Sequence, residues 1–342
     1  MQRILVVRND KIGDFMLAWP SFAMLKASCD CHVTALVPSY TAPLARLCPW
    51  IDDVILDPGV NGDVPAQRQL KQQLQAARFD AAIALFSNGR NAWLLWQAGI
   101  RYRLAPATKW AQFLFNHRLV QRRSRSQKPE FEYNLDLIRH FLRQHDVAIV
   151  EPAPPYMQFD APTLATVRAK TAADLGLEAA MPWMMVHAGT GGSATNLSMT
   201  QYAELVLGLQ RQHRMPCVVT AGPGEEANAA ELQALIQAQG GEVRVYHSRQ
   251  GLDYFCQLIA NAALFIAGST GPLHIAAALD VPTVGFFPAR RSATPLRWQP
   301  LNSRGRHLAF TPPAGSDKEK EMSLIAMPEV LLRVNDWLAG LH

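Results

Sequence analysis

Short runs of aliphatic and β-branched residues alternate with amphipathic segments along the whole chain. In the first half these runs lie at residues 4–7, 33–37, 54–56 and 81–85. Helical patterns at 14–26, 42–47 and 66–77 separate them. Because parallel strands need a crossover connection, usually a helix, this alternation favours a parallel sheet with right-handed crossovers. The sequence therefore predicts an α/β fold.

A proline-rich stretch divides the chain into two similar halves. Residues 151–155, Glu-Pro-Ala-Pro-Pro, cannot form a helix interior and indicate a linker. A helical pattern at 162–175 then leads to a second series of strands, at 184–187, 216–221, 242–246, 264–267 and 283–287. The 342 residues suit two domains at roughly 150 residues each. We predict two Rossmann-like domains, 1–155 and 156–322, and a C-terminal helix within 323–342.

Composition excludes several classes of protein. Hydrophobic residues make up 49% of the chain and charged residues 18%, so a disordered chain is excluded. The net charge of +5 suits an anionic substrate or membrane surface but is too small to argue for nucleic acid, so no nucleic-acid partner is expected. The N-terminus has the pattern of a strand, not a signal peptide, and no run reaches about 18 apolar residues. The five cysteines match no zinc pattern. We predict a cytoplasmic protein with reduced thiols and no metal site.

The first candidate site follows the first strand, at residues 8–14, Arg-Asn-Asp-Lys-Ile-Gly-Asp. In open parallel sheets, ligands bind beyond the carboxyl ends of the strands. Gly13 permits a close backbone approach, and Asp14 begins the next helix. Asp14 could cap that helix, which is the commoner role at such a position, or act as a general base. The turn lacks Gly-x-Gly-x-x-Gly, which argues against a dinucleotide-binding domain.

The second candidate site is the turn after the strand at 264–267. Ser269, Thr270 and Gly271 form a run of small residues, and Pro272 suits the first turn of an Ala-rich helix. Free N–H groups at such a helix start bind anions, so a diphosphate is the expected ligand. His274 lies in the first helical turn and could contact the same anion. The alternative is an ordinary strand–helix turn with a buried histidine.

Two glycine-rich loops also follow strands of the second half. The loop 188–193 carries Thr190 and Ser193, with Thr195 just beyond, and could hold phosphate or sugar. The loop 221–226 carries Glu225 and Glu226, either of which could bind ribose hydroxyls. Equally, these two acids could simply favour the positive end of the helix dipole.

Basic residues cluster in the first half. Five cations lie within eleven residues: Arg118, Arg122, Arg123, Arg125 and Lys128. They could form a solvated face, or could meet an acidic acceptor or anionic lipid headgroups. Most of the nearby aromatic residues are expected in the core, although Trp110 and Phe113 could touch a membrane; the set is Trp93, Trp96, Trp110, Phe113 and Phe115. A second basic group follows the last predicted strand: Arg290, Arg291, Arg297, Arg304 and Arg306.

In order and spacing, four segments resemble glycosyltransferase family 9, the bacterial heptosyltransferases of lipopolysaccharide core synthesis. Residues 8–14 resemble the family's first strand–loop, which ends in Gly-Asp, and residues 132–136 resemble a segment before the domain crossover. Residues 189–193 resemble the donor loop. Residues 269–277 resemble the strongest signature, Asp-Thr-Gly-x-x-His followed by an Ala-rich helix. The resemblance covers nearly the whole chain.

The resemblance implies a GT-B fold, with two Rossmann-like domains facing across a cleft and a C-terminal helix that packs back on the first. It implies inverting transfer of heptose from ADP-heptose to the lipid A–Kdo inner core, without cofactor or metal, at the cytoplasmic face of the inner membrane. Asp14 matches the general base. The donor-binding positions are Thr190, Ser193, Thr195, Glu225, Ser269, Thr270, Gly271 and His274. We assign acceptor binding to Lys11, Arg90, Arg118 and Arg122, expect peripheral membrane contact, and favour a monomer.

Two positions depart from the family pattern. Thr195 stands where many members have Lys, and Ser269 stands where classical members have Asp. Either Lys11 or Arg291 supplies the missing cation, or the donor differs. The alternatives are therefore a glycosyltransferase that uses another nucleotide sugar for a cell-surface glycan, or a sugar-nucleotide epimerase, for which no convincing acid/base set is visible. A sugar-binding protein of the periplasmic kind is disfavoured by the absence of a signal peptide and by the diphosphate-type helix start.

Overall fold

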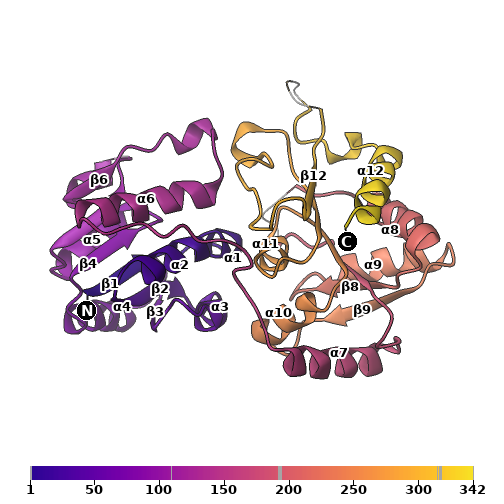
Figure 1. Ribbon diagram of the computed structural model, residues 1–342, viewed down its shortest axis with the longest axis horizontal. Coiled ribbons are helices and arrows are strands. Elements are labelled where there is room, and N and C mark those ends of the chain that lie inside the picture. The colour runs from indigo at the N-terminus through magenta and orange to yellow at the C-terminus, as the bar shows by residue number, and fades with distance from the viewer. Residues whose placement is uncertain (1, 109, 192–194, 314, 316–317, 342) are drawn as a thin grey trace. The chain divides into compact units, whose positions relative to one another are not determined.

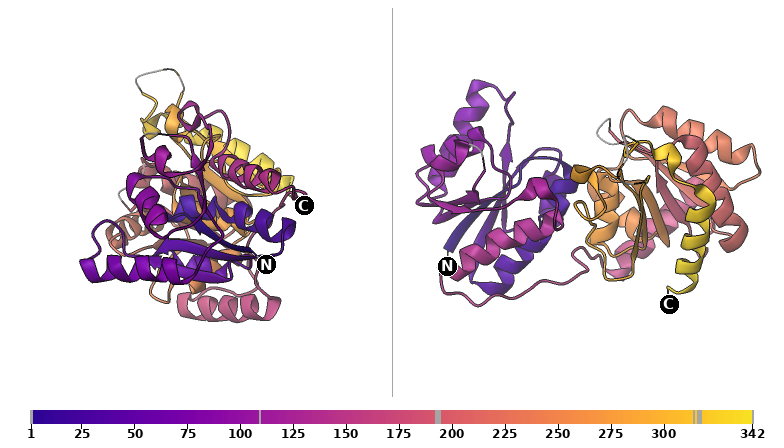
Figure 2. Two further views of the ribbon diagram at one scale, coloured as in Figure 1. Left: turned by 90° about the vertical axis from the view of Figure 1, so that its left-hand side faces the viewer. Right: turned by 90° about the horizontal axis from the view of Figure 1, so that it is seen from above.

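The computed structural model describes the chain except for residues 1, 109, 192–194, 314, 316–317 and 342. The chain divides into two units, Met1–Ala153 and Pro154–His342, close to the division expected from the proline-rich stretch. Each unit is built on one six-stranded parallel sheet with helices, as the alternating pattern predicts. Figures 1 and 2 show the first unit in indigo to magenta and the second in pink to yellow.

The first sheet has the order β3-β2-β1-β4-β5-β6, and all its neighbours are parallel. Its strands are β1 (Gln2–Val7), β2 (Cys31–Pro38), β3 (Asp53–Asp57), β4 (Ala81–Ala84), β5 (Tyr102–Pro106) and β6 (His117–Leu119). Four consecutive residues of β1, from Ile4 on, are fully buried, as expected for a strand covered on both faces. The strand order reverses between β1 and β4, and such a switch point is where ligands bind in these sheets.

The helices of the first unit are α1 (Ile12–Met16), α2 (Trp19–Ser28), α3 (Ala42–Leu47), α4 (Val64–Ala76), α5 (Gly89–Gln97), η1 (Trp110–Leu114), η2 (Arg123–Arg125) and α6 (Glu130–Gln144). The single helix predicted over 14–26 is wrong, because the structure divides it into α1 and α2. Pro20 lies in the first turn of α2. Proline has no N–H to continue the ladder of α1, but it is tolerated where a helix begins.

The second sheet repeats the plan, with the order β12-β11-β10-β7-β8-β9. Its strands are β7 (Met184–His187), β8 (Cys217–Ala221), β9 (Val243–His247), β10 (Leu264–Gly268), β11 (Thr283–Phe286) and β12 (His307–Phe310). Its helices are α7 (Ala161–Leu175), α8 (Met199–His213), α9 (Glu226–Gln237), α10 (Leu252–Ala260), α11 (Gly271–Ala278), η3 (Arg291–Ala293), η4 (Met322–Leu324) and α12 (Met327–Ala339). The strand order here reverses between β7 and β10.

The C-terminal helix α12 packs within the second unit. Val330 and Val334 are fully buried in that unit's core, and α12 contacts α8. Leu331 lies against Gly208 of α8, where an added Cβ would come within 2.4 Å of it. The apolar face of α12 is therefore used by the second core, and the expected contact of this helix with the first domain stays a prediction.

Among the helices that the structure describes, none has both the length and the apolar character needed to span a bilayer.

Candidate functional site

A buried arginine organises the carboxyl end of β1. Arg8 follows β1 directly and is almost fully buried. Its Nη2 donates to Asp14 Oδ1 at 2.5 Å, its Nε lies 2.9 Å from Asp10 Oδ1, and its Nη1 donates to Glu130 Oε1 at 3.2 Å. Nη1 also lies 3.3 Å from Asn134 Oδ1. One guanidinium therefore holds three carboxylates at the switch point of the first sheet.

The charges of this cluster are strongly coupled. Burial raises the pKa of Asp10 to about 7 against the lowering effect of Arg8, and the charge of Asp14 adds to the rise. Burial alone would lower the pKa of Arg8, but the three carboxylates outweigh it and raise that pKa. Arg8 is therefore a fixed cation that stabilises the carboxylate charge around it.

Asp14 lies within α1 and does not cap it. The N-cap residue is Lys11, which makes no side-chain cap, so the capping role considered for Asp14 is not adopted. The Asp14 side chain is 17% exposed, and Arg8 holds its Oδ1. Oδ2 has no hydrogen-bond partner within the described ranges. An oriented carboxylate with one available oxygen can accept a proton from a bound hydroxyl.

Helix α6 supplies residues that sequence reasoning missed. Glu130 Oε1 also accepts from Arg123 Nη1 at 2.6 Å, and Asn134 Nδ2 donates to the carbonyl of Leu17 at 3.1 Å. Both side chains are buried. The signal in the sequence was a pair of polar residues at i and i+4 on the buried face of a helix. They connect α6 to Arg8, and so to Asp14.

Arg90, predicted to bind the acceptor, is held by a carboxylate at the end of β3. Its two terminal nitrogens donate to Asp57 at 2.9 and 2.6 Å, and Nη2 also reaches Gln67 Oε1 at 2.9 Å. Burial would raise the pKa of Asp57, but Arg90, Gly59 and Asn9 donate to it and lower the pKa. The guanidinium thus joins β3 to α5, and its contact with an acceptor stays a prediction.

The other predicted acceptor residues lie apart from one another. Lys11 precedes α1, Arg118 is the middle residue of β6, and Arg122 precedes η2; all three are exposed. The structure shows no contact that gathers them. Their acceptor role also stays a prediction.

The expectation that most of the neighbouring aromatic residues lie in the core is wrong. Only Phe115 is buried, whereas the other four side chains are exposed: Trp93, Trp96, Trp110 and Phe113. In α5 the core-facing positions are taken by Asn91, Ala92, Leu94 and Leu95, so the two tryptophans of this helix lie on its other side.

In the second unit, the turn between β10 and α11 has the predicted form. The N–H of Ser269 donates to the carbonyl of Phe286 at 3.0 Å, and Thr270 is an extended N-cap whose side chain makes no cap. Gly271 is the first helical residue, and the proline after it lies in the first turn. The first N–H groups of α11 are therefore not occupied by a side chain of this N-cap, which leaves them suited to an anion.

His274 lies in the first turn of α11 and is buried. Its Nδ1 has no hydrogen-bond partner in the part of the chain that the structure describes. Burial lowers the pKa of His274 to about 3, with a contribution from His307. The side chain is therefore neutral near pH 7. Because a buried unsatisfied polar group costs about 1–3 kcal/mol, this nitrogen is available to a hydrogen bond from a ligand or a water molecule.

Glu225 joins the two glycine-rich loops. Its Oε1 accepts from the N–H of Gly191 and its Oε2 from the N–H of Gly222, both at 2.9 Å. A Cβ at Gly189 would lie 2.1 Å from the Glu225 carboxyl carbon, so any larger residue there would have to displace this carboxylate. The predicted ribose contact of Glu225 stays a prediction, since the loops already use both oxygens. Glu226 is exposed at the start of α9.

His187, at the end of β7, was missed by the sequence analysis. Its Nε2 lies 3.5 Å from Glu225 Oε2, and its Nδ1 lies 2.9 Å from Thr220 Oγ1. Burial lowers the pKa of His187, although the Glu225 charge opposes this. A polar residue at the last position of a buried strand was the available signal.

The loop after β7 is tied to the end of β10 by Asn196. Its Nδ2 donates to the carbonyl of Ala188 at 2.9 Å, and its Oδ1 accepts from the Tyr202 hydroxyl at 2.6 Å. A Cβ at Gly268 would come within 2.5 Å of Asn196 Oδ1. Asn196 therefore brings the two candidate donor segments together, a role the sequence did not reveal.

The remaining donor predictions are less defined by contacts. Thr195 is exposed and Thr190 is half-buried, while Ser193 lies outside the described residues. Arg291, suggested as a replacement cation, is exposed in η3.

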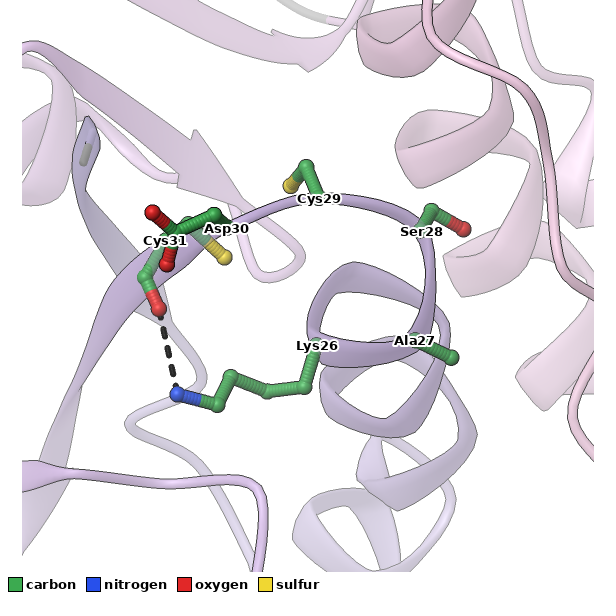
Figure 3. Close-up of a pocket in the computed structure, with 6 residues that line it drawn as sticks. All are labelled: Lys26, Ala27, Ser28, Cys29, Asp30 and Cys31. Carbon is green, nitrogen blue, oxygen red and sulfur yellow. Dashed lines mark hydrogen bonds between the residues drawn. The ribbon is translucent and has the colours of Figure 1, made fainter.

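A hollow between α2 and β2 is not part of either site (Figure 3). It is lined by Lys26, Ala27, Ser28, Cys29, Asp30 and Cys31. The Lys26 ammonium donates to the Cys31 carbonyl at 3.1 Å. The hollow lies where β2 begins, whereas Arg8 lies where the parallel strand β1 ends. The two therefore lie at opposite ends of the strands. All five cysteines are free, and no group of three metal-ligating side chains is present among the described residues.

Comparisons with known proteins agree with this architecture. The family model "Glycosyltransferase family 9 (heptosyltransferase)" matches residues 67–326. A Haemophilus influenzae protein named "Putative glycosyltransferase" is 51% identical over 336 residues, 98% of this chain and 96% of the relative. The solved structure of E. coli ADP-heptose lps heptosyltransferase II matches with a TM-score of 0.79 and 21% identity, covering 99% of both chains.

A second solved structure, E. coli heptosyltransferase WaaC with ADP, matches with a TM-score of 0.74 and 18% identity, covering 98% of this chain and 100% of that one. These likenesses confirm the predicted α/β fold of the GT-B type. Since the family model matches more than half of its residues, the chain belongs to glycosyltransferase family 9 (heptosyltransferase) and is a glycosyltransferase.

Proposed function

We propose that this glycosyltransferase moves a heptose from ADP-heptose to the lipid A–Kdo inner core of lipopolysaccharide, with inversion at the anomeric carbon. The observation that carries the proposal is Asp14, a partly exposed carboxylate at the carboxyl end of β1 whose Oδ1 is held by Arg8. The names of the similar solved structures, an ADP-heptose heptosyltransferase and a heptosyltransferase with ADP, support the donor class.

In the proposed reaction, Asp14 acts as the general base. Its Oδ2 takes the proton from an acceptor hydroxyl while that oxygen attacks the anomeric carbon of the donor. The new C–O bond forms as the bond to the diphosphate breaks on the opposite face, and the anomeric configuration inverts. Arg8 keeps the carboxylate in one orientation during this step, which avoids reorganisation at the moment of reaction.

The leaving diphosphate carries the negative charge that develops in the transition state. The N–H groups at the start of α11 and the hydroxyls of Ser269 and Thr270 are suited to stabilise it. His274 adds a neutral ring whose Nδ1 is unsatisfied among the described residues. We assign the stabilisation of the leaving group to these residues; that the step needs no cofactor or metal stays an expectation from the family resemblance.

The acceptor is proposed to be an acidic glycan linked to a lipid, met at the cytoplasmic face of the inner membrane. Exposed Lys11, Arg118 and Arg122 provide positive charge for it on the first unit. A net charge of +5 agrees with an anionic substrate.

Substitution of Asp14 tests the base. Asp14→Asn keeps the size of the side chain but removes the proton acceptor, so transfer should fall about 100-fold or more while ADP binding is kept. Asp174→Asn, an exposed carboxylate on α7, is the matched control. Turnover should be measured with ADP-heptose and inner-core acceptor, and nucleotide binding by calorimetry. Wild-type turnover in Asp14→Asn contradicts the assignment.

A screen of nucleotides tests the donor. Preference for ADP over UDP and GDP supports ADP-heptose. Preference for UDP or GDP would favour another nucleotide sugar, as Ser269 and Thr195 allow, and would leave the reaction type intact.

A further inference from the structure

One segment of the first unit has a charge unlike the rest of the chain. Residues 81–129 contain nine Lys or Arg and no Asp or Glu. The remainder of the chain carries 24 Lys or Arg against 28 Asp or Glu, so all of the positive net charge comes from this segment. Such a concentration of one sign attracts an anionic partner from a distance.

Several cations of this segment are not used inside the protein. Arg123 pairs with Glu130 and Lys128 pairs with Asp136. In contrast, Arg118, Arg122 and Arg125 are exposed and form no ion pair with any residue that the structure describes. Their charges face solvent.

Large apolar side chains are exposed beside these cations. Trp110 is 70% exposed, and Phe113 and Val120 are each 76% exposed. The Arg118 guanidinium lies 5.9 Å from the centre of the Phe113 ring. We call Trp110, Phe113, Arg118 and Val120 the η1–β6 patch; β6 forms the edge of its sheet (Figure 1).

Helix α5 extends the aromatic surface. It packs against η1, and an added Cβ at Gly89, its first residue, would lie 3.1 Å from the Trp110 ring. Its own exposed residues Trp93 and Trp96 stack at 5.0 Å. Four of the five exposed large aromatic side chains among the described residues therefore lie on α5 and η1. An apolar group of this kind marks an interaction site.

We infer that the η1–β6 patch docks on the surface of an anionic lipid bilayer. Tryptophan and other aromatic rings favour the region between lipid headgroups and acyl chains, and arginines favour anionic headgroups. The patch combines both kinds of residue and lacks acidic side chains that a bilayer of the same sign would repel. The inference rests on the proposed function in one respect, since a lipid-linked acceptor requires the enzyme to reach a membrane.

The patch also connects to the candidate base. η1 follows the carboxyl end of β5. Because β1, β4 and β5 are parallel, this end lies on the same side of the sheet as Arg8 and Asp14, which follow β1. Arg123, between the exposed Arg122 and Arg125, shares Glu130 Oε1 with Arg8. Docking through the η1–β6 patch therefore brings the bilayer to the carboxyl ends of the strands. Asp14 lies at these ends, and the acceptor sugar must reach it.

Vesicle co-sedimentation tests the inference with the full chain. The wild type should bind vesicles that contain phosphatidylcholine and phosphatidylglycerol, and high salt should weaken this binding. Its binding to vesicles of phosphatidylcholine alone should be weak. Trp110→Ser with Phe113→Ser should lower the partition coefficient about tenfold. The matched control, Val64→Ser with Leu332→Ser, removes two apolar side chains that are exposed elsewhere and should bind as the wild type does.

Two results would overturn the docking surface: no binding of anionic vesicles by the wild type, or full binding by the Trp110/Phe113 variant. Turnover on a delipidated, water-soluble acceptor distinguishes a failure of membrane docking from a failure of the proposed function. The Trp110/Phe113 variant should keep wild-type turnover on that acceptor and lose turnover on acceptor in vesicles. Equal loss on both acceptors would also overturn docking, because the patch would then act on the reaction itself.

Discussion

The two units share one sheet plan but prepare their candidate sites by different physical means. In the first, Arg8 and three carboxylates place side-chain charges at the switch point between β1 and β4. In the second, the turn between β10 and α11 offers backbone N–H groups and a neutral His274. The proposed proton acceptor is a carboxylate, whose charge a neighbouring cation holds in place, whereas a diphosphate brings its own charge and needs hydrogen-bond donors. The difference follows from the two halves of the proposed reaction.

The same difference decides what each site tolerates. A buried ion pair is costly to break from one side, because the remaining charge stays buried without a partner. A backbone site does not depend on side-chain charge, but it requires that the backbone segments approach closely. Removal of a charge should therefore damage the first unit most, and addition of a methyl group should damage the second.

The largest effect is expected from Arg8→Met. This change keeps much of the side-chain volume but removes the cation that pairs with Asp10 and Asp14 and leaves Glu130 with Arg123 alone, so the free energy of unfolding should fall by about 3–5 kcal/mol. Urea unfolding at neutral pH measures it. Arg90→Met is the matched control, because that pair with Asp57 is more exposed at its arginine and should cost less. Equal losses of unfolding free energy in Arg8→Met and Arg90→Met would contradict the special dependence of the first site on the buried charge of Arg8.

The second effect concerns Gly189. In Gly189→Ala the new Cβ would overlap the Glu225 carboxylate, which must leave and so lose its bonds to Gly191 and Gly222. The free energy of unfolding should fall by about 2–3 kcal/mol, and ADP affinity should fall with it. Gly340→Ala, where the nearest atoms lie at ordinary contact distance, is the control. Unchanged stability and ADP affinity in Gly189→Ala would show that the two loops do not need Glu225.

Sequence reasoning reached the strands that are buried on both faces, because their apolar runs are continuous. It missed β5, β6 and β12, whose residues are partly polar and partly exposed, so that no run stands out. It also selected Asp14, Thr270 and His274 as candidates, because each lies in the turn or first helical turn after a strong strand, and their roles stay predictions. It did not find Glu130 or Asn196, because their roles arise from contacts with Arg8 and Gly268 that are distant along the chain.

The aromatic residues show a further limit of patterns. Hydrophobicity predicts burial for Trp93 and Trp110 as readily as for Phe115, yet only Phe115 is buried. Which face of a short helix meets the core depends on the neighbouring strands, and that information is absent from the local sequence.

The smallest expected effect is a pH dependence of stability, which tests whether His274 in the second site is uncharged. Burial keeps the pKa of His274 at about 3, whereas an unfolded histidine has a pKa near 6.5. The unfolded state therefore binds a proton below about pH 6.5 that the folded state does not bind until about pH 3. The free energy of unfolding therefore decreases as the pH falls from about 6.5 towards 3, because protons bind to His274 in the unfolded state and favour it. Between pH 7 and 5 the wild type should lose about 2 kcal/mol more than His274→Gln.

Urea unfolding of both proteins at the two pH values measures this difference. Asp10, whose pKa is raised to about 7, has the opposite pH dependence, but it is present in both proteins and cancels in the comparison. His247→Gln, a substitution of an exposed histidine on β9, should follow the wild type. Parallel curves for the wild type and His274→Gln would mean that the folded site accepts a proton at pH 5. The second site would then hold a cation as the first does, and the contrast between the two units would fail.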